Sequence, residues 1–555
     1  MTCPHLERCA GCPLMHLPLE AQRVEKQSLL ARAFRRHSVL RDLVIPDVVA
    51  AEPSLGYRTR LKWMVERNSL GMYGRDANHR VVDTPECLVA SPLLLEIAKT
   101  LRGRVAELGL DAMDLREAQT ADGPRVLVTL VVPIKDSTNR LQAFAEELCL
   151  RHPEIVGVAE NVRGRKNPQI LGQETSLLRG VPIVQDRLDR AYVLGTFGSF
   201  VQAHRGQARA LADAMAQAAL EIASKPRVLE LFGGSGAFGL ELAARGMAVD
   251  LVESFAPAAA LARRAATEQR LPLTAHSGDA THFATQAALR RERYDVVLVD
   301  PPRRGLSAEL RRSLVKLNPR LLVYVSCHPT TLARDLEHLA FLGFQVRALR
   351  GYDMIPQTDH VETLCFIAPC APVPLETLWR DAASAVVDRP AFLTDDEVLS
   401  GARRSLDWPG ASFVKQRTLT SGATSVAKGP GHPPRVFRRA LVLAKGVTTR
   451  RGDAVGIDFR QLAVVGGHSL LDVAVGDSLD ALVSAFAKTG HPVLGAASCD
   501  PATSRHFVEK HGLERPFIHV TTLVLPGGES VESGLAGDLA GVLASLGCVW
   551  PQPAV

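Results

Sequence analysis

Four cysteines near the start of the chain have a spacing that suits a metal site. Cys3, Cys9 and Cys12 follow a C-x5-C-x2-C pattern, and Cys87 stands in the segment Thr84-Pro-Glu-Cys-Leu88. Four thiolates can hold either a tetrahedral zinc ion or a four-iron, four-sulfur cluster. The spacing does not choose between the two, so the sequence predicts a four-cysteine site whose metal stays open.

A further cysteine lies where a nucleophile would be useful. Cys327 follows the apolar segment Leu321–Ser326, which has the character of a strand, and the segment His360-Val-Glu-Thr363 comes later in the chain. A cysteine at the carboxyl end of a parallel strand faces the crevice where ligands bind, and its thiolate can attack a substrate. The alternative is a buried, unreactive thiol. The motifs on either side favour the nucleophile.

A glycine-rich turn and a series of acids indicate a cofactor site. The strand-like segment Val228–Phe232 runs into Gly233-Gly-Ser-Gly236, whose glycines let a ligand approach a helix N-terminus. Glu253, Asp279 and Asp300 end the next candidate strands, the first at the distance that suits ribose hydroxyls. A pyrophosphate would need cations or bare N–H groups. Acids at successive strand ends therefore favour an adenosyl ligand such as S-adenosylmethionine.

The segments that must position these residues alternate between strands and helices. After Val228–Phe232, candidate strands at Val249–Val252, Val296–Val299, Leu322–Val325 and Thr363–Ile367 are separated by helix-length segments. This alternation predicts a parallel, doubly wound sheet. We therefore expect a Rossmann-like α/β domain over residues 196–370, preceded by a small mixed α/β region over residues 1–195. A proline-rich linker at 368–374 precedes a third domain, residues 375–555.

Composition limits the class of protein. Of the 555 residues, 46% are hydrophobic and 22% are charged, which excludes a disordered chain, and no uncharged apolar run reaches the roughly 18 residues of a membrane span. The N-terminus does not resemble a signal peptide, so we expect a cytoplasmic protein without a membrane partner. Residues 371–555 carry 18 basic and 18 acidic side chains, so the net charge of +6 lies in residues 1–370. An anionic partner would therefore bind mainly there.

Together these motifs resemble those of the RNA uracil-5-methyltransferase family, and most closely its iron–sulfur members that modify large-subunit ribosomal RNA. The resemblance covers about residues 1–370. In chain order, it rests on the four cysteines, Phe200-Val-Gln-Ala-His204, Glu230-Leu-Phe-Gly-Gly-Ser-Gly236, Asp300-Pro-Pro-Arg-Arg-Gly305, Ser326-Cys327 and Val361-Glu362.

The resemblance implies methyl transfer from S-adenosylmethionine to C5 of a uridine in RNA, with 23S ribosomal RNA as the expected substrate. It implies a 4Fe-4S cluster on the four cysteines, Cys327 as the nucleophile, and Glu362 as the base that removes the C5 proton. The family pattern departs from this chain at Gly233, Ala237 and His204. The residues expected to contact the donor are Gln202, Phe232, Glu253, Asp279 and Asp300.

The chemistry explains why a cysteine and a carboxyl are both needed. Uracil C5 is too weak a nucleophile to attack a methyl sulfonium, so Cys327 first adds to C6 and creates an enolate. After methyl transfer, Glu362 takes the C5 proton and elimination restores the planar base. A paired base is out of reach of this chemistry, so the uridine must be unpaired or flipped out.

The third domain resembles part of a pseudouridine synthase catalytic domain. The resemblance rests on the segments Gln416–Gly422, Ser469–Val473, Gly490–Gly495 and Phe517–His519. The family's essential aspartate before Thr-Ser-Gly is absent from Gln416–Gly422. We therefore expect a degenerate, non-catalytic domain that positions RNA, contacts a partner or is purely structural.

Three alternatives to the main hypothesis remain. The protein could be a noncatalytic RNA-binding or assembly factor, although such a factor has no need of a nucleophile and a base. It could form 5-methyluridine in transfer RNA. Methylation of cytosine C5 is disfavoured because no second cysteine accompanies the segment Asp300–Pro302. The sequence does not set the oligomeric state.

Overall fold

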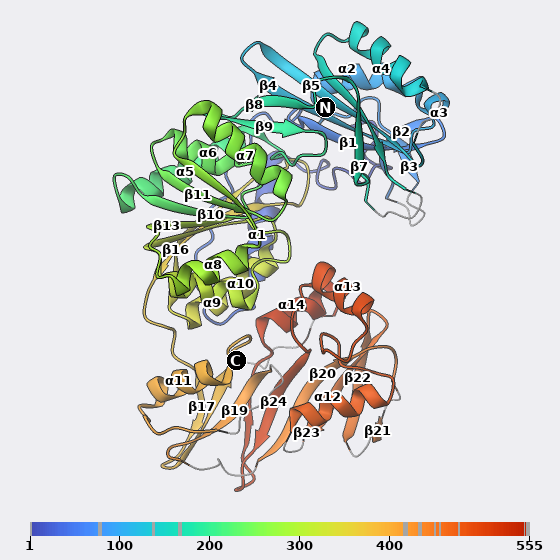
Figure 1. Ribbon diagram of the computed structural model, residues 1–555. Coiled ribbons are helices and arrows are strands. Elements are labelled where there is room, and N and C mark those ends of the chain that lie inside the picture. Colours follow the sequence, from blue (N-terminus) through green and yellow to red (C-terminus); the bar gives the residue numbers. More distant parts are fainter. Residues whose placement is uncertain are drawn as a thin grey trace.

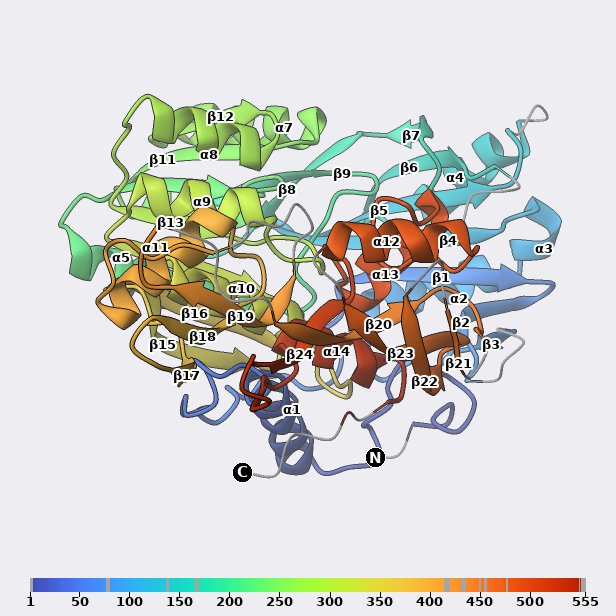
Figure 2. The same ribbon diagram turned by 90° about the horizontal axis from the view of Figure 1, so that it is seen from below.

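Three large β-sheets follow one another along the chain, each with helices packed on it (Figure 1; Figure 2). The computed structural model describes residues 3–75, 80–135, 139–164, 169–413, 420–430, 436–448, 451–453, 457–475, 478–548 and 550. Most of the predicted segment Gln416–Gly422 lies outside these described residues, which omit 414–419.

The N-terminal sheet has seven strands in the order β3-β2-β1-β4-β5-β6-β7. Alternate residues of β5, such as Val126 and Val128, face α2 and α4, which cover one side with Leu94 and Phe144. This is the period of two expected of a strand with one helix-covered face. The elements are β1 (Arg60–Glu66), β2 (Ser69–Tyr73), β3 (Val81–Asp83), α2 (Pro92–Arg102), α3 (Val105–Leu108), β4 (Ala112–Thr120), β5 (Gly123–Val132), α4 (Arg140–Arg151), β6 (Ile155–Val162) and β7 (Glu174–Gly180).

The second sheet has the strand order β12-β11-β10-β13-β14-β16-β15 and is covered on both faces. Helices α5, α6 and α7 pack on one face and α8, α9 and α10 on the other, each with its own apolar core. A hairpin of β8 (Ile183–Arg187) and β9 (Tyr192–Thr196) leads from the first sheet into α5. The remaining elements are α5 (Arg205–Ile222), β10 (Arg227–Leu231), α6 (Ala237–Ala244), β11 (Ala248–Glu253), α7 (Ala256–Gln269), β12 (Leu273–Ser277), α8 (Ala280–Leu289), β13 (Val296–Val299), α9 (Ala308–Leu317), β14 (Leu321–Ser326), α10 (Pro329–Phe341), β15 (Phe344–Tyr352) and β16 (Glu362–Pro369).

This sheet confirms the predicted α/β architecture but is not wholly parallel. Strands β10, β11, β12, β13 and β14 are parallel, whereas β16 runs antiparallel to both β14 and β15. The connection from β15 to β16, residues 353–361, contains no helix. It is too short for the crossover that a parallel pair requires, so β16 must return in the opposite direction.

Helix α1 (Leu19–Phe34) precedes the N-terminal sheet in the chain but packs on the second one. The buried Lys26 forms an ion pair with Asp353, and Gln22 donates a hydrogen bond to Gln357 at 2.9 Å. Phe34 joins the same apolar core as α8, α9 and α10. The N-terminal segment therefore ties residues 1–195 to the second sheet.

The third domain is a mixed sheet with the order β17-β18-β19-β24-β20-β23-β22-β21, in which β25 pairs with β24. Within the described ranges, no helix combines the length and apolar character needed to cross a bilayer. The elements are β17 (Thr377–Arg380), β18 (Ser384–Arg389), α11 (Asp395–Leu406), β19 (Ser421–Ala427), β20 (Phe437–Ala444), β21 (Arg451–Asp453), β22 (Asp458–Val465), β23 (His468–Val475), α12 (Leu479–Lys488), α13 (Pro501–His511), β24 (Ile518–Val524), β25 (Ser530–Glu532) and α14 (Gly537–Ser545).

A buried ion pair inside the third domain yields a stability prediction. Arg515 donates to both carboxylate oxygens of Asp538, at 2.8 and 2.9 Å, and to Ser421 Oγ at 2.9 Å. Asp538→Asn leaves a buried guanidinium without its countercharge, so we expect the free energy of unfolding to fall by about 3–5 kcal/mol. Calorimetry of the full chain measures this as an unfolding transition at a lower temperature.

The matched control is Glu532→Gln, which removes an exposed carboxylate from the same domain. It should change the free energy of unfolding by less than about 0.5 kcal/mol. An Asp538→Asn protein that unfolds at the same temperature as the wild type would show that the ion pair adds no stability.

Candidate active site

The parallel strands of the second sheet end along one edge, and the glycine-rich turn lies there. After β10 the chain turns sharply, with φ of 63° at Phe232 and 55° at Gly234. A Cβ added at Gly233 would lie 2.5 Å from the side chain of Leu251 on the next strand. The turn therefore requires glycine for close packing as well as for conformation, and it leads directly into α6.

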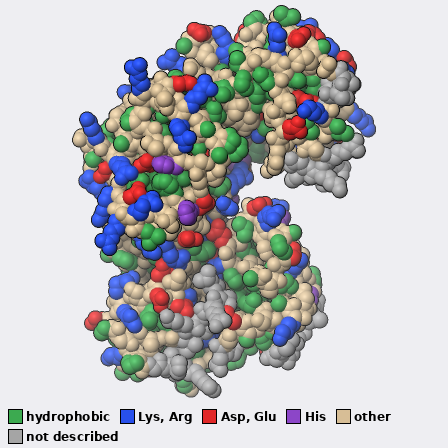
Figure 3. Space-filling view, viewed as in Figure 1, with side chains coloured by type: hydrophobic (Ala, Val, Ile, Leu, Met, Phe, Trp, Pro, Cys, Tyr) green, Lys and Arg blue, Asp and Glu red, His purple; other side chains and the backbone are tan. Residues whose placement is uncertain are grey.

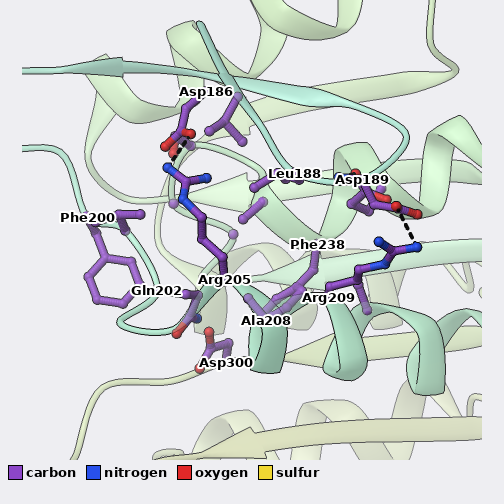
Figure 4. Close-up of a pocket in the computed structure, with 18 of the residues that line it drawn as sticks. Asp186, Leu188, Asp189, Phe200, Gln202, Arg205, Ala208, Arg209, Phe238 and Asp300 are labelled. Carbon is purple, nitrogen blue, oxygen red and sulfur yellow. Dashed lines mark hydrogen bonds and ion pairs between the residues drawn. The ribbon is translucent and has the colours of Figure 1, made fainter. Parts of the chain in front are cut away.

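A cavity beside this turn is lined by three of the five predicted donor contacts, Gln202, Phe232 and Asp300. Figure 4 shows Gln202 and Asp300 close to each other, with the ring of Phe200 to one side. Phe200 is 71% exposed, an unusual state for so large an apolar side chain. The cavity thus has acidic and amide oxygens inside and an accessible aromatic ring at its edge.

The other two predicted donor contacts have different surroundings. Glu253 accepts the N–H of Gly234 at 3.0 Å and that of Phe255 at 2.7 Å, so it braces the glycine-rich turn from the next strand. Asp279 is exposed and caps α8 by accepting the N–H of His282 at 2.9 Å. Neither carboxylate lines the cavity of Figure 4.

Two carboxyls that line the cavity, Asp300 and Glu230, have raised pKa values. Burial raises the pKa of Asp300 to about 7. Burial, together with the charge of Asp300, raises the pKa of Glu230 to about 8. One oxygen of Glu230 has no hydrogen-bond partner among the described residues, and a Cβ added at Gly239 would lie 2.2 Å from it. Such a site favours a ligand that brings positive charge, because the charge would stabilise both carboxylates.

A second group of cavity residues was not indicated by the sequence. Asp186 pairs with Arg205 at 2.7 Å and with the buried Arg116 at 3.3 Å, and all three line the cavity (Figure 4). A Cβ at Gly195 would lie 2.3 Å from the guanidinium of Arg116. Arg116 comes from β4 of the N-terminal sheet, so its place here depends on how the first two sheets pack.

Cys327 and Glu362 lie beside the last pair of two neighbouring strands. β14 and β16 pair as far as Ser326 opposite Thr363, and Cys327 and Glu362 are the next residues of the two segments. Burial and the charge of Glu362 raise the pKa of Cys327 to about 11. Burial and the charge of Asp300 raise the pKa of Glu362 well above its usual value. The predicted nucleophile and base are therefore brought together beside Asp300.

Arg303 supplies the positive charge of this group. It is exposed in the loop after Asp300, and its charge lowers the pKa of Cys327 and of Glu362, against the larger effect of burial. Stabilising a thiolate and a carboxylate is a catalytic task. The motif Asp300–Gly305 contains Arg303, but its two successive arginines do not indicate which of them faces the thiol.

The four N-terminal cysteines line one cavity between the N-terminal loop and the first sheet. Burial and the charge of Cys87 raise the pKa of Cys12 to about 12, and burial also raises the pKa of Cys9 and of Cys87. The backbone N–H of Gly11 donates to the sulfur of Cys9 at 3.3 Å. Four thiolates could share this space only with a compensating cation.

The sulfurs are not drawn together as tightly as ligands around one ion. No three His, Cys, Asp or Glu side chains in the described part of the chain are grouped closely enough to hold a metal ion. Phe200 and Val201 line both this cavity and the cavity of Figure 4, so one short segment separates the two.

Comparisons with known proteins agree with this geometry. Residues 154–369 match the family described as tRNA (Uracil-5-)-methyltransferase. An uncharacterized RNA methyltransferase of Halalkalibacterium halodurans is 28% identical over 377 residues, which is 65% of this chain and 81% of that protein. One of Geobacter sulfurreducens is 28% identical over 390 residues, covering 67% and 77% of the two chains.

A solved structure extends the agreement to the fold. The tRNA (uracil-54, C5)-methyltransferase of Pyrococcus abyssi, crystallised with S-adenosyl-L-homocysteine, is 25% identical to this chain. It superposes with a TM-score of 0.55 and covers 66% of this chain and 86% of its own. Residues 154–369 thus match the tRNA (uracil-5-)-methyltransferase family, and the comparisons together indicate an S-adenosylmethionine-dependent RNA methyltransferase.

Proposed function

We propose that the protein transfers a methyl group from S-adenosylmethionine to C5 of a uridine in ribosomal RNA, through a covalent bond between Cys327 and C6. This proposal is supported by the neighbourhood of Cys327 and Glu362, which adjoin the last pair of β14 and β16 and whose pKa values respond to each other's charge or to that of Asp300. A thiol and a carboxyl at facing strand ends can reach the two adjacent carbons of one flat base. A protein that only bound RNA would have no use for this pair.

The charges of the site support a cationic methyl donor. The charges of Asp300 and Glu362 raise the pKa of Cys327, and the charge of Asp300 raises that of Glu362, so the thiol and this carboxyl favour their protonated forms. The positive charge of a sulfonium would lower all three pKa values, as Arg303 already does for Cys327 and Glu362. Donor binding would in this way favour the thiolate that the reaction needs.

The reaction then follows from the positions of the two groups. The thiolate of Cys327 forms a bond to C6, and the electron pair displaced from the ring double bond lets C5 attack the methyl group. The bond between methyl and sulfur breaks, and S-adenosylhomocysteine remains. The carboxylate of Glu362 takes the proton from C5, and the bond between C6 and Cys327 breaks to restore the thiolate. The uridine must be unpaired or flipped to enter.

The proposal of ribosomal RNA as the substrate class is supported by the four N-terminal cysteines. The resemblance to family members that modify ribosomal RNA rests in part on these cysteines, and they line one cavity. Transfer RNA is the second candidate because the P. abyssi relative is a tRNA (uracil-54, C5)-methyltransferase. The two classes are separated by offering both RNA pools to the purified protein.

The cysteine cavity also suits a 4Fe-4S cluster. Cys3, Cys9, Cys12 and Cys87 supply four sulfur ligands, the number that such a cluster takes, and the Gly11 N–H already donates to one of them. A bound cluster would supply the positive iron charge that lets four partly buried thiolates lie together.

The first prediction concerns Cys327. Cys327→Ala should abolish transfer of the labelled methyl group to RNA and leave the dissociation constant of the donor within about twofold, because the bond to C6 is lost while the cavity of Figure 4 stays intact. Nucleoside analysis of ribosomal and transfer RNA pools measures the product, 5-methyluridine. Cys370→Ala, at an exposed cysteine, is the control. Normal turnover by the Cys327→Ala protein would refute the nucleophile assignment.

The second prediction separates methyl transfer from release. Glu362→Gln preserves the shape of the side chain but cannot take the C5 proton, so an RNA–protein adduct should accumulate on a denaturing gel. Glu309→Gln, at an exposed position on α9, should show no adduct. Multiple turnovers by Glu362→Gln without any adduct would assign the base to another residue.

The third prediction concerns the metal. Protein purified without oxygen should be brown and contain about four irons per chain, because four cysteines line one cavity. Cys87→Ser should lower the iron content, whereas Cys149→Ser, outside this cavity, should not. About one zinc per chain, with no iron after anaerobic purification, would show that the four cysteines bind zinc and not a cluster.

A further inference from the structure

The loop that carries Arg303 is held by α10, the helix that begins just after Cys327. Thr331 Oγ1 donates a hydrogen bond to the carbonyl of Arg303 at 3.0 Å. Arg334 Nη2 donates to the carbonyl of Arg304 at 2.8 Å. The first turns of α10 thus fix the backbone of the loop that carries Arg303, whose positive charge acts on Cys327 and Glu362.

The third domain contacts the same turns of α10 from the opposite side. Arg334 Nη1 pairs with Glu514 at 3.2 Å and donates to the carbonyl of Gly512 at 3.5 Å. A Cβ added at Gly541 of α14 would lie 2.9 Å from the side chain of Thr330, so the two helices approach as closely as a glycine allows. Figure 1 shows α13 and α14 on the side of the third domain that faces the second sheet.

The contact is charged and shielded from water. The side chain of Arg334 is 3% exposed and that of Glu514 is 17% exposed. The ring of Phe392, from the third domain, lies 4.6 Å from the guanidinium of Arg311, 5.7 Å from that of Arg334 and 5.8 Å from that of Arg515. Buried charged contacts of this kind fix the geometry of an interface, because any displacement leaves a charge unpaired.

We propose that Glu514 of the third domain is a positioning residue for methyl transfer, which acts through Arg334 to hold the loop of Arg303 against Cys327 and Glu362. Arg334 divides its donors between the third domain and the carbonyl of Arg304. The third domain would thus take part in catalysis without touching the donor or the base. This inference rests on the function proposed above.

The charge on Glu514 is needed for this role. Without it, Arg334 keeps its bonds to Asp335, from Nε at 2.9 Å and from Nη2 at 2.7 Å, but Nη1 loses its charged partner and the guanidinium is held less firmly toward Arg304. The loop would keep its bonds to Thr331 and Asp335 but be held less firmly at Arg304, so Arg303 would stabilise the anionic forms of Cys327 and Glu362 less well. The loss should appear in the chemical step and not in donor binding, because Glu514 and Arg334 do not line the cavity of Figure 4.

The test uses the full-length protein with labelled S-adenosylmethionine and the RNA pool on which the wild type is active. Glu514→Ala should lower kcat by roughly three- to tenfold, in the lower part of the range of couplings between contacting residues, with the donor KM within about twofold of the wild type. Glu514→Gln preserves a hydrogen-bond acceptor, so its kcat should fall less than that of Glu514→Ala. Glu509→Gln removes an exposed carboxylate from α13 and should match the wild type. Full activity of Glu514→Ala would overturn the proposal.

A double-mutant cycle with Arg303→Ala distinguishes positioning from general stability. If Glu514 acts through the loop of Arg303, Glu514→Ala should change kcat by less than about twofold once Arg303 is absent. Equal losses in both backgrounds would mean a merely structural role and would overturn the proposal. Should Glu514→Ala fail to fold, Glu514→Gln completes the cycle. A wild type that forms no 5-methyluridine in any RNA would instead refute the proposed function.

Discussion

The buried carboxylate of Asp335 organises the region around the active site. It accepts the N–H of Leu306 at 2.7 Å and the hydroxyl of Tyr324 at 2.8 Å, and it pairs with Arg311 at 2.8 Å and Arg334 at 2.7 Å. These four partners come from the loop after β13, from β14, from α9 and from α10. Because both guanidiniums are buried, each needs this countercharge, and the loop, the strand and the helices are fixed relative to one another.

The active site shows the opposite electrostatic arrangement. There the charges of Asp300 and Glu362 raise the pKa of Cys327, the charge of Asp300 raises that of Glu362, and the charge of Arg303 opposes both shifts. An arrangement that is unfavourable in the empty protein becomes favourable when a cationic ligand enters, which is typical of binding sites and rare in structural ion pairs. The rigid surroundings keep the acids in place despite their repulsion.

Much of the second sheet and of the candidate site could be predicted from the sequence because the sequence patterns that indicate them are local. The strands of the second sheet, the glycine-rich turn and Cys327 are each visible in a short window of residues. Glu253 and Asp279 illustrate the limit: both stand near strand ends as predicted, but one braces a turn and the other caps a helix. Arg116 and Glu514 gave no signal at all, because their partners Asp186 and Arg334 are distant in sequence and only three-dimensional packing brings them together.

The two sides of the contact between α10 and the third domain are far apart in the sequence, which has a consequence for biosynthesis. Gly512 follows Arg334 by 178 residues, which a ribosome adding about 5–20 residues per second completes in roughly 9–36 s. During that interval the first two sheets can fold, with the donor cavity and Cys327 already formed, while the loop of Arg303 still lacks its outer support. A nascent or truncated chain would therefore recognise its donor before it could methylate efficiently, and the last-made domain would complete the enzyme.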